Sequence, residues 1–521
     1  MKCFAFHTCN IPCRKTIIRQ AVREYQTGPF VGRTTGQRKF WEQRGATTRR
    51  SHRCKASSYA ASQKTSAERT EVDDLVRWLI EQKGLPPQRT DCVGVNTDGT
   101  WAFFTNADVR EGEALVELPG DISVTAVDVA AHEEVSGLAE GRGELTGLAL
   151  WLMAERQKGP ASQWAPFLEC LPDATESPVL WPEQQQAELL QNSPTLKECR
   201  QRRAALQQEW DNIAQQIASS DGRRFSEEVY NGEAFERAMS VVLAHAAYLP
   251  SAACFALLPL AAQVPRTGDE SGALLDYDLQ RERVTICATR PYRRGEPIAI
   301  YDGRPNGELL LATGRVEDDN ASDCLTITVG LVQTDRLFSV KKQIVESVGF
   351  GTVQEFPIFR DRMPTQLLAY LRLARLTDPA LLAKVSFEED VILNQLNEYE
   401  VLQLLLGECR DRLTSYAGSA EEDLKLLQQA GLSERERLAA RLRMAEKRIL
   451  QGTLDAVRRR LAPIRGIPTK SGGLTDPNAD LKEVFDVIET LPSLPGKVVG
   501  GFMSWARGEQ DPDWKKKKPP R

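Results

Sequence analysis

The sequence predicts an α+β protein in which a β-rich domain with a helical insert is followed by an all-helical domain. Short β-rich runs, bounded by Gly, Pro and Arg, occur between about residues 100 and 330. A stretch with helical periodicity interrupts them at about 145–240, and helical patterns dominate after about residue 331. At roughly 100–200 residues per domain, the 521 residues suffice for two to four domains.

The first 56 residues have the composition of a plastid transit peptide. They carry 13 Lys+Arg against 2 Asp+Glu, are rich in Ser and Thr, and lack a continuous apolar segment. The alternative interpretation is a basic arm that binds nucleic acid or acidic partners. We expect a transit peptide at 1–56, a small-residue linker at 57–70 and a chloroplast location, in the stroma or the nucleoid.

Charge and cysteine spacing exclude several classes of protein. Outside the first 56 residues the chain holds 54 Lys+Arg and 70 Asp+Glu, a net charge of −16, which disfavours non-specific nucleic-acid binding over the whole surface. The longest strongly apolar run, Ala252–Ala262, is too short to span a bilayer. The eleven cysteines include no CxxC pair, so we expect free thiols rather than a disulfide framework or a metal site.

The elements of the first domain follow from apolar spacing. Leu75–Gln82 and Leu145–Glu155 have apolar residues at three- and four-residue intervals and predict helices, as does the Gln- and Glu-rich stretch 183–218. Runs rich in β-formers predict strands at Trp101–Thr105, Ala114–Leu118, Val284–Ala288, Ile298–Ile300 and Leu325–Val329.

The second domain is expected to be helical and to end before a basic tail. Ser433–Glu436 is a Ser-x-x-Glu capping box that opens a long helix, and Pro463 marks its end. Residues 466–479 form a Gly/Pro/Ser linker before a short helix at Leu481–Leu491. The predicted domains are therefore 71–330, 331–465 and a final segment at 466–521. Nucleic acid is expected to be contacted only indirectly or through Lys515–Lys518.

Motifs with a self-evident chemistry are absent. The sequence has no GxGxxG after a strand, no GxxxxGK[ST] and no GxSxG. Composition and spacing alone therefore predict an organellar α+β protein and leave its activity open.

Several stretches, in order, resemble the SET-domain family, in particular the plastid group that includes the Rubisco large-subunit lysine methyltransferases. The similar stretches in the first domain are Trp78–Leu85, Asp108–Pro119, Trp151–Glu155, Leu258–Ala261 and Tyr301–Leu310. In the second domain, Leu413, Tyr416, Asp423 and Ala445–Leu450 look like the helical substrate-binding domain of the same group. The resemblance, which covers about residues 71–462, implies a SET domain at 71–330 and a Rubisco-methyltransferase-type substrate-binding domain at 331–465.

Such a family implies transfer of a methyl group from S-adenosylmethionine to a lysine side chain. The amine must be neutral and in line with the methyl sulfonium, which the family achieves by positioning and electrostatics. No metal is required.

The cofactor-binding positions of the family are altered in this sequence. The resemblance aligns the family's Gly-x-Gly with Thr100–Ala102, so that Trp101 and Ala102 stand where the backbone approaches the cofactor. It aligns the family's Asn-His with Pro265 and Arg266, and proline lacks even the backbone donor.

The catalytic position is altered as well. The family's catalytic tyrosine aligns with Thr313, whose hydroxyl is too short to replace a phenol. The loss of one well-placed hydroxyl donor commonly costs about 3 kcal/mol of transition-state stabilisation. Tyr301 is the candidate substitute, because it would supply a phenol from a neighbouring position.

Three functions remain open from the sequence. The segment Asp302–Gly314 resembles the corresponding segment of SET-domain proteins associated with the plastid-encoded RNA polymerase. This resemblance favours an eroded methyltransferase site and a protein-assembly role in plastid transcription. Plastid RNA polymerase subunits are then the candidate partners. The alternative is an active S-adenosylmethionine-dependent protein-lysine N-methyltransferase acting on a stromal protein. A third interpretation is an interaction module that binds no cofactor.

Overall fold

The computed structural model describes residues 66–95, 101–171, 176–219 and 225–464. The described chain forms two compact units, the first ending at Ser322 and the second beginning at Asp323. The short segment Ala187–Pro194 belongs to the second unit. The expected transit peptide, linker, Leu481–Leu491 helix and Lys515–Lys518 tail lie outside the described residues, and the predicted domain bounds stay a prediction.

The first unit combines small β-sheets with helices. Its N-terminal helix α3 (Ser66–Lys83) precedes β1 (Thr90–Val95) and β2 (Trp101–Thr105), which pair antiparallel. Strands β3 (Ala114–Pro119), β8 (Arg283–Cys287) and β7 (Leu274–Asp278) form a three-stranded antiparallel sheet in that order. Two further pairs are β4 (Ala247–Leu249) with β5 (Cys254–Ala256), antiparallel, and β6 (Arg266–Thr267) with β9 (Ile300–Tyr301), parallel.

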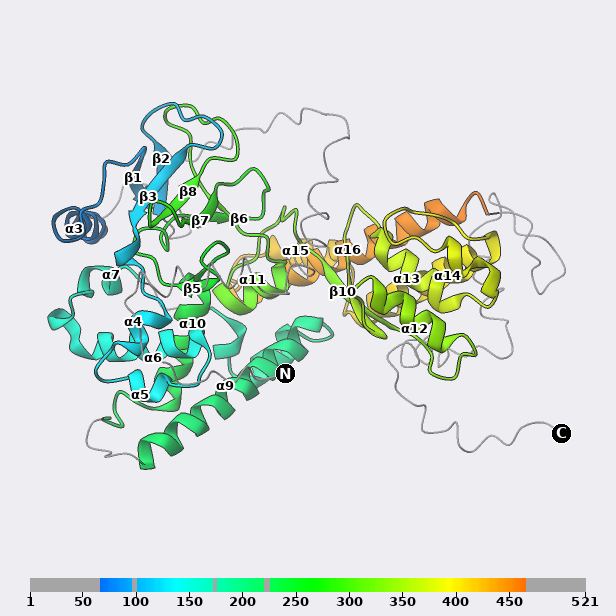
Figure 1. Cartoon of the computed structure of the whole chain (residues 1–521), viewed down its shortest axis with the longest axis horizontal. Coiled ribbons are helices and arrows are strands. Elements are labelled where there is room, and N and C mark those ends of the chain that lie inside the picture. Colours follow the sequence, from blue (N-terminus) through cyan, green and yellow to red (C-terminus); the bar gives the residue numbers. More distant parts are fainter. Residues whose placement is uncertain (1–65, 96–100, 172–175, 220–224, 465–521) are drawn as a thin grey trace. The chain divides into compact units, whose positions relative to one another are not determined.

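Helices fill the interval between β3 and β4, as the predicted insert requires. They are α4 (Ala126–Ala130), α5 (Ser136–Ala139), α6 (Glu144–Lys158), α7 (Ala165–Glu169), α8 (Glu183–Leu189), α9 (Pro194–Ser219) and α10 (Gly232–His245). Helix α11 (Asn306–Thr313) follows β9. In Figure 1, β3, β7 and β8 lie on one side of this unit, and α4, α5, α6 and α10 gather on the other.

The core of the first unit joins these elements. It includes the tryptophans Trp78, Trp151 and Trp164, and the Trp164 ring lies 5.8 Å from that of Trp78 and 5.6 Å from that of Trp151. The apolar face predicted for Leu75–Gln82 is therefore confirmed, because Leu75, Trp78 and Leu79 are all buried.

The second unit is mostly helical and also contains one two-stranded antiparallel sheet, so it is not all-helical as expected. Strands β10 (Leu325–Gly330) and β11 (Val353–Ile358) pair antiparallel on either side of α12 (Phe338–Ser347). Helices α13 (Thr365–Arg375), α14 (Gln395–Ser415), α15 (Ala420–Leu427) and α16 (Glu434–Leu461) complete the unit. The Ser433 capping box at the start of α16 is confirmed, since Ser433 and Glu436 bond each other's backbone N–H.

Three local predictions differ from the structure. The strand expected at Ile298–Ile300 begins only at Ile300, because Ile298 instead donates its N–H to Phe103 O at 2.9 Å. The helical stretch 183–218 breaks into α8 and α9 at Asn192, whose positive φ and the following Ser193–Pro194 end the first helix. Strand β11 was not predicted, because its alternating pattern is interrupted by Pro357.

Two further properties of the described residues bear on the sequence predictions. The six cysteines with described side chains are free thiols. None of the described helices combines the length and the hydropathy that crossing a membrane would demand.

Candidate functional site

The parallel pair β6–β9 brings two of the predicted site segments together. Arg266 lies opposite Ile300 and Thr267 lies opposite Tyr301. The N–H of Ile300 donates to Pro265 O at 2.7 Å, and the N–H of Asp302 donates to Thr267 O at 2.7 Å. Residues 265–267 and 300–302, separated in the sequence by strands β7 and β8, therefore share one ladder of hydrogen bonds.

The third predicted segment runs beside the same ladder. Ala102 is buried in β2, next to Phe103, whose carbonyl accepts the Ile298 N–H just before β9. The backbone of Trp101 pairs with Val95, while Thr100 lies outside the described residues. Ala102 thus lies in the strand whose next residue, Phe103, contacts the segment just before β9.

Thr313 occupies the last position of α11, where its hydroxyl is already used. Its Oγ1 donates to Leu309 O at 2.7 Å, one turn earlier in the same helix. The following Gly314 has φ +67°, and a Cβ there would lie 2.7 Å from the backbone carbon of Glu176. The helix end is therefore fixed by tight packing, and the Thr313 hydroxyl satisfies its own helix.

Tyr301 has a different set of contacts. Its phenol oxygen lies 3.0 Å from Ser322 Oγ, and a Cβ on Gly303 would lie 3.0 Å from the same oxygen. The hydroxyls of Tyr301 and Thr313 thus share no hydrogen-bond partner in the described chain. Each hydroxyl therefore has a local partner, and Tyr301 as a substitute for the family's tyrosine stays a prediction.

An arginine cluster beside β9 was not predicted from the sequence. Asp302 is 7 % exposed and is gripped by Arg304, with Nε–Oδ1 at 2.8 Å and Nη2–Oδ2 at 2.6 Å. Burial alone would raise the pKa of Asp302, but the hydrogen bonds and charge of Arg304, aided by Arg266, lower it overall. Both oxygens of the Asp302 carboxylate therefore already accept hydrogen bonds from Arg304.

Arg266 is the less satisfied member of this cluster. Its Nη2 is buried and has no hydrogen-bond partner among the described residues. Burial lowers the pKa of the Arg266 guanidinium, Asp302 raises it, and the charges of Arg304 and Arg315 lower it again. The only signal for this in the sequence was the charge of Arg266 itself, because Arg304 lies in the turn after β9 and Arg315 lies beyond α11, far from Arg266 in the chain.

The two motif residues that the chain keeps in α11 have structural partners. Asn306 is 1 % exposed and clamps the loop after α11, giving Nδ2 to Glu317 O at 2.9 Å and accepting the Glu317 N–H at 3.0 Å. Glu308 pairs with Arg202 of α9, whose Nη1 lies 3.1 Å from Glu308 Oε1. These bonds stabilise the position of α11 independently of any catalytic role.

S-adenosylmethionine, which the resemblance implies, can be tested against these residues. The cofactor carries a sulfonium cation. The positions that the resemblance assigns to its contacts hold Pro265, which has no N–H, and Arg266, whose buried Nη2 has no hydrogen-bond partner among the described residues. The buried Arg266 guanidinium is influenced by the Asp302 carboxylate as well as by Arg304 and Arg315. These residues do not reproduce the Asn-His contacts that the resemblance implies, and no reaction step is derived through S-adenosylmethionine.

The motif residues of the second unit form a buried polar network. Lys447 is fully buried and donates to Asp423 Oδ2 at 2.7 Å, and Tyr416 donates to Glu446 Oε2 at 2.9 Å. Arg443 Nη2 also contacts Asp423, at 3.2 Å from Oδ1. This network joins α15 to α16, so the residues that suggested a substrate-binding domain hold that domain together.

Comparison with protein families supports the second unit's assignment. A family model described as Rubisco LSMT substrate-binding matches residues 332–450.

Curated relatives extend the similarity over most of the chain. The Nicotiana tabacum chloroplastic ribulose-1,5-bisphosphate carboxylase/oxygenase large subunit N-methyltransferase is 24% identical over 412 residues, 75% of this chain and 82% of the relative. The Arabidopsis thaliana chloroplastic [fructose-bisphosphate aldolase]-lysine N-methyltransferase is 26% identical over 407 residues, covering 74% and 83%. A Danio rerio actin-histidine N-methyltransferase is 25% identical over 426 residues, covering 74% and 68%.

Solved structures give the same fold. A crystal structure of the SET domain of LSMT bound to lysine and AdoHcy matches with a TM-score of 0.62 at 21% identity, over 83% of this chain and 98% of that one. A structure of Rubisco LSMT bound to AdoMet matches with a TM-score of 0.60 at 21% identity, over 83% and 99%. The chain therefore has the SET-domain fold of the LSMT type with a substrate-binding-type C-terminal domain, and over most of its length it is similar to Rubisco LSMT-like SET-domain methyltransferases.

Proposed function

We propose that this chain is a chloroplast SET-domain protein whose methyltransferase site is eroded, and that it acts as a protein-assembly subunit of the plastid transcription machinery. The observation that carries this proposal is the state of Thr313. Where the resemblance expects a catalytic phenol, the chain has a short hydroxyl that is bonded to its own helix at 2.7 Å. Such a group has neither the reach nor a free donor to act on a methyl group in transfer.

The altered cofactor positions support the same conclusion independently. Pro265 has no N–H to offer, and the buried guanidinium of Arg266 is followed in the turn after β9 by Arg304. Meanwhile Asn306 and Glu308 keep their structural bonds, and both units keep continuous apolar cores. A protein selected only for binding would be expected to keep its apolar cores and to lose the side chains that methyl transfer needs.

The assembly role is supported by what remains in the chain. The second unit matches a family model described as Rubisco LSMT substrate-binding, which supports the proposal that this unit binds a protein partner. Two of the relatives are chloroplastic, and the first 56 residues have the composition of a transit peptide. We therefore propose a chloroplast location and protein partners there, with subunits of the plastid RNA polymerase as first candidates and with nucleic acid contacted only indirectly or through Lys515–Lys518.

The test of the eroded site is an incorporation assay with matched variants. The purified chain is incubated with methyl-labelled S-adenosylmethionine and plastid extract, alongside Thr313→Val and Tyr301→Phe variants. We expect background labelling from all three proteins, and no tight binding of S-adenosylmethionine by titration calorimetry. Labelling that persists in Thr313→Val and disappears in Tyr301→Phe would instead identify an active protein-lysine N-methyltransferase that uses Tyr301.

The test of the partner is separate. The chain is recovered from isolated plastids under mild conditions and its associated proteins are identified by mass spectrometry. We expect RNA polymerase subunits in stoichiometric amounts. Their absence, with stromal enzymes recovered instead, would refute the transcription role while leaving the eroded site untouched.

A further inference from the structure

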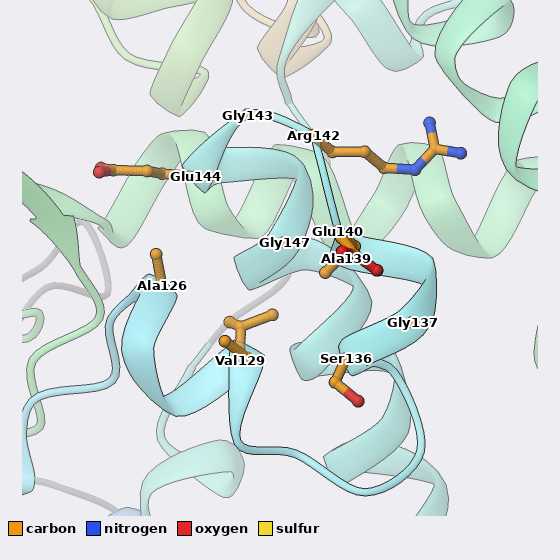
Figure 2. A pocket seen from close by; sticks show the side chains of 11 residues that line it. Ala126, Val129, Ser136, Gly137, Ala139, Glu140, Arg142, Gly143, Glu144 and Gly147 are labelled. Atoms are coloured by element: carbon orange, nitrogen blue, oxygen red, sulfur yellow. The ribbon is translucent and has the colours of Figure 1, made fainter. Parts of the chain in front are cut away.

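Two adjoining cavities open on the helical insert of the first unit. The smaller, of about 380 Å³, lies between α4, α5 and the start of α6, and its lining is built from small residues such as Ala126, Ala139 and Gly147 (Figure 2). The larger, of about 650 Å³, is lined mostly by apolar side chains, among them Leu206, Met239 and Phe255. Both cavities include Gly143 and Glu144, and we refer to the pair as the insert groove.

The two cavities adjoin at the start of α6, because Gly143 and Glu144 line both of them. A Cβ on Gly143 would meet no heavy atom within 4 Å, so the space above this residue is open. Gly143 is the N-cap of α6 with φ −67° and ψ 152°, a conformation that every L-residue adopts without strain. An extended chain could therefore lie across Gly143 with a side chain in each cavity.

The charges of the groove favour a cationic occupant. Arg142 is fully engaged, bonding Glu209 and Gln216 at 2.9 Å and Leu138 O at 2.7 Å, and Figure 2 shows its side chain directed away from Val129. Glu140 is exposed and forms no salt bridge with any described residue. Glu144 accepts only the backbone N–H of Phe255 in the described chain, at 2.8 Å.

The larger cavity has the same sign of charge. Arg202 contacts both Glu308 and Glu198, the latter at 2.7 Å, so two carboxylates share one guanidinium. The apolar wall beside this ion pair suits a large aliphatic or aromatic side chain, and burial of such a side chain is the usual source of affinity at an interface.

We propose that the insert groove docks an extended segment of another protein, which places a large apolar side chain in the larger cavity and a lysine or arginine near Glu140. The inference does not depend on whether the chain transfers methyl groups or on which plastid protein is its partner. The carboxylates of the groove select the basic residue, and the apolar cavity supplies most of the affinity.

The experiment uses synthetic peptides and the full chain. An array of nine-residue peptides carries one Leu, Phe or Trp and one Lys at spacings of one to five residues, in a Gly/Ser background. Matched peptides replace Lys by Glu, or the apolar residue by Ala. We expect peptides with both features to bind most tightly, peptides with Glu in place of Lys to bind more weakly, and the advantage of Lys to shrink as salt rises.

Three variants localise the binding. Gly143→Trp fills the passage and is expected to weaken binding at least tenfold. Ala205→Trp, which lines the larger cavity, should weaken binding, whereas Ala204→Trp on the same exposed stretch of α9 should not.

The charge is tested in the same way. Glu140→Lys should weaken binding of Lys peptides about fivefold at low salt, and Glu133→Lys, an exposed residue outside the lining, should not. Equal binding of Glu and Lys peptides, or undiminished binding by a folded Gly143→Trp variant, would overturn the proposal. Neither outcome bears on methyl transfer, which is measured without these peptides.

Discussion

Replacement of Lys447 by methionine should loosen the second unit without affecting the first. Lys447 is fully buried in α16, and its Nζ uses all three donors, to Asp423 Oδ2 at 2.7 Å, Ala417 O at 3.2 Å and Ser419 O at 3.4 Å. Methionine keeps much of the side-chain length and removes the charge. Asp423, whose side chain is only 6% exposed, would then keep Arg443 as its charged partner.

The expected cost follows from this geometry. Removal of one member of a buried ion pair destabilises by about 3–5 kcal/mol, because the other charge is left without compensation. Since Arg443 still contacts Asp423 Oδ1, the lower end of that range, about 3 kcal/mol, is expected here. At about 1.4 kcal/mol per factor of ten, this corresponds to roughly a 100-fold increase in the opening equilibrium of the unit.

Hydrogen exchange measured by mass spectrometry reads this effect locally. Peptides from the interior of α16 should exchange roughly 100-fold faster in Lys447→Met, while peptides from α6 in the first unit should keep their rate and serve as an internal control. Lys425→Met, an exposed lysine on α15, is the matched variant and should change neither set. If α16 exchange rises less than fivefold, the buried network does not stabilise the unit and the reasoning fails.

Three other perturbations test individual contacts. Gly314→Ala should destabilise by about 2 kcal/mol or more, because φ is +67° and the added Cβ would meet backbone at 2.7 Å; Gly137→Ala, with open space around it, should be nearly neutral in the same thermal unfolding assay. Burial raises the pKa of Glu155, but hydrogen bonds from Lys158, Ser162 and His132 lower it overall, so its stabilising contribution is present above about pH 4.5 and is lost as the pH falls through the folded pKa. The difference in urea midpoint between wild type and Glu155→Gln should therefore shrink below pH 4.5, and a constant difference would contradict this. Thr313→Val should cost no more than about 1 kcal/mol in chemical denaturation, since only the bond to Leu309 O is lost, and a larger cost would show a further role for the hydroxyl.

The sequence predicted those elements whose stability is local. The capping box at Ser433 and the apolar face of α3 depend on residues within one or two turns, and both are confirmed. Strand β11 and the two-residue pair β6–β9 depend on partners far away in the chain. The local alternation of apolar and polar residues therefore does not predict them. Length and pattern determine a helix, whereas a short strand exists only because its partner is present.

The candidate site shows the same division. Alignment to a family located Arg266, Tyr301 and Thr313, but not what they contact. The guanidinium cluster arises because Arg304 turns back onto Asp302 after β9, and the bond from Thr313 to Leu309 arises from the helix itself. Contacts of this kind depend on local backbone geometry. They determine whether the polar group of an altered residue is free or already hydrogen-bonded within the fold.

Under the proposed function, the differences at Thr313 and Arg266 act on different requirements of methyl transfer. A phenol at 313 would supply a longer hydroxyl donor, but it would leave the buried Arg266 guanidinium where the resemblance implies a cofactor contact. A neutral residue at 266 would remove that charge and would still leave Thr313 without a phenol. On this proposal neither single reversion restores transfer, whereas Asn306 and Glu308 stabilise the fold through bonds that need no cofactor. A chain selected only for binding would then keep the packing of the motif and lose the groups that transfer needs.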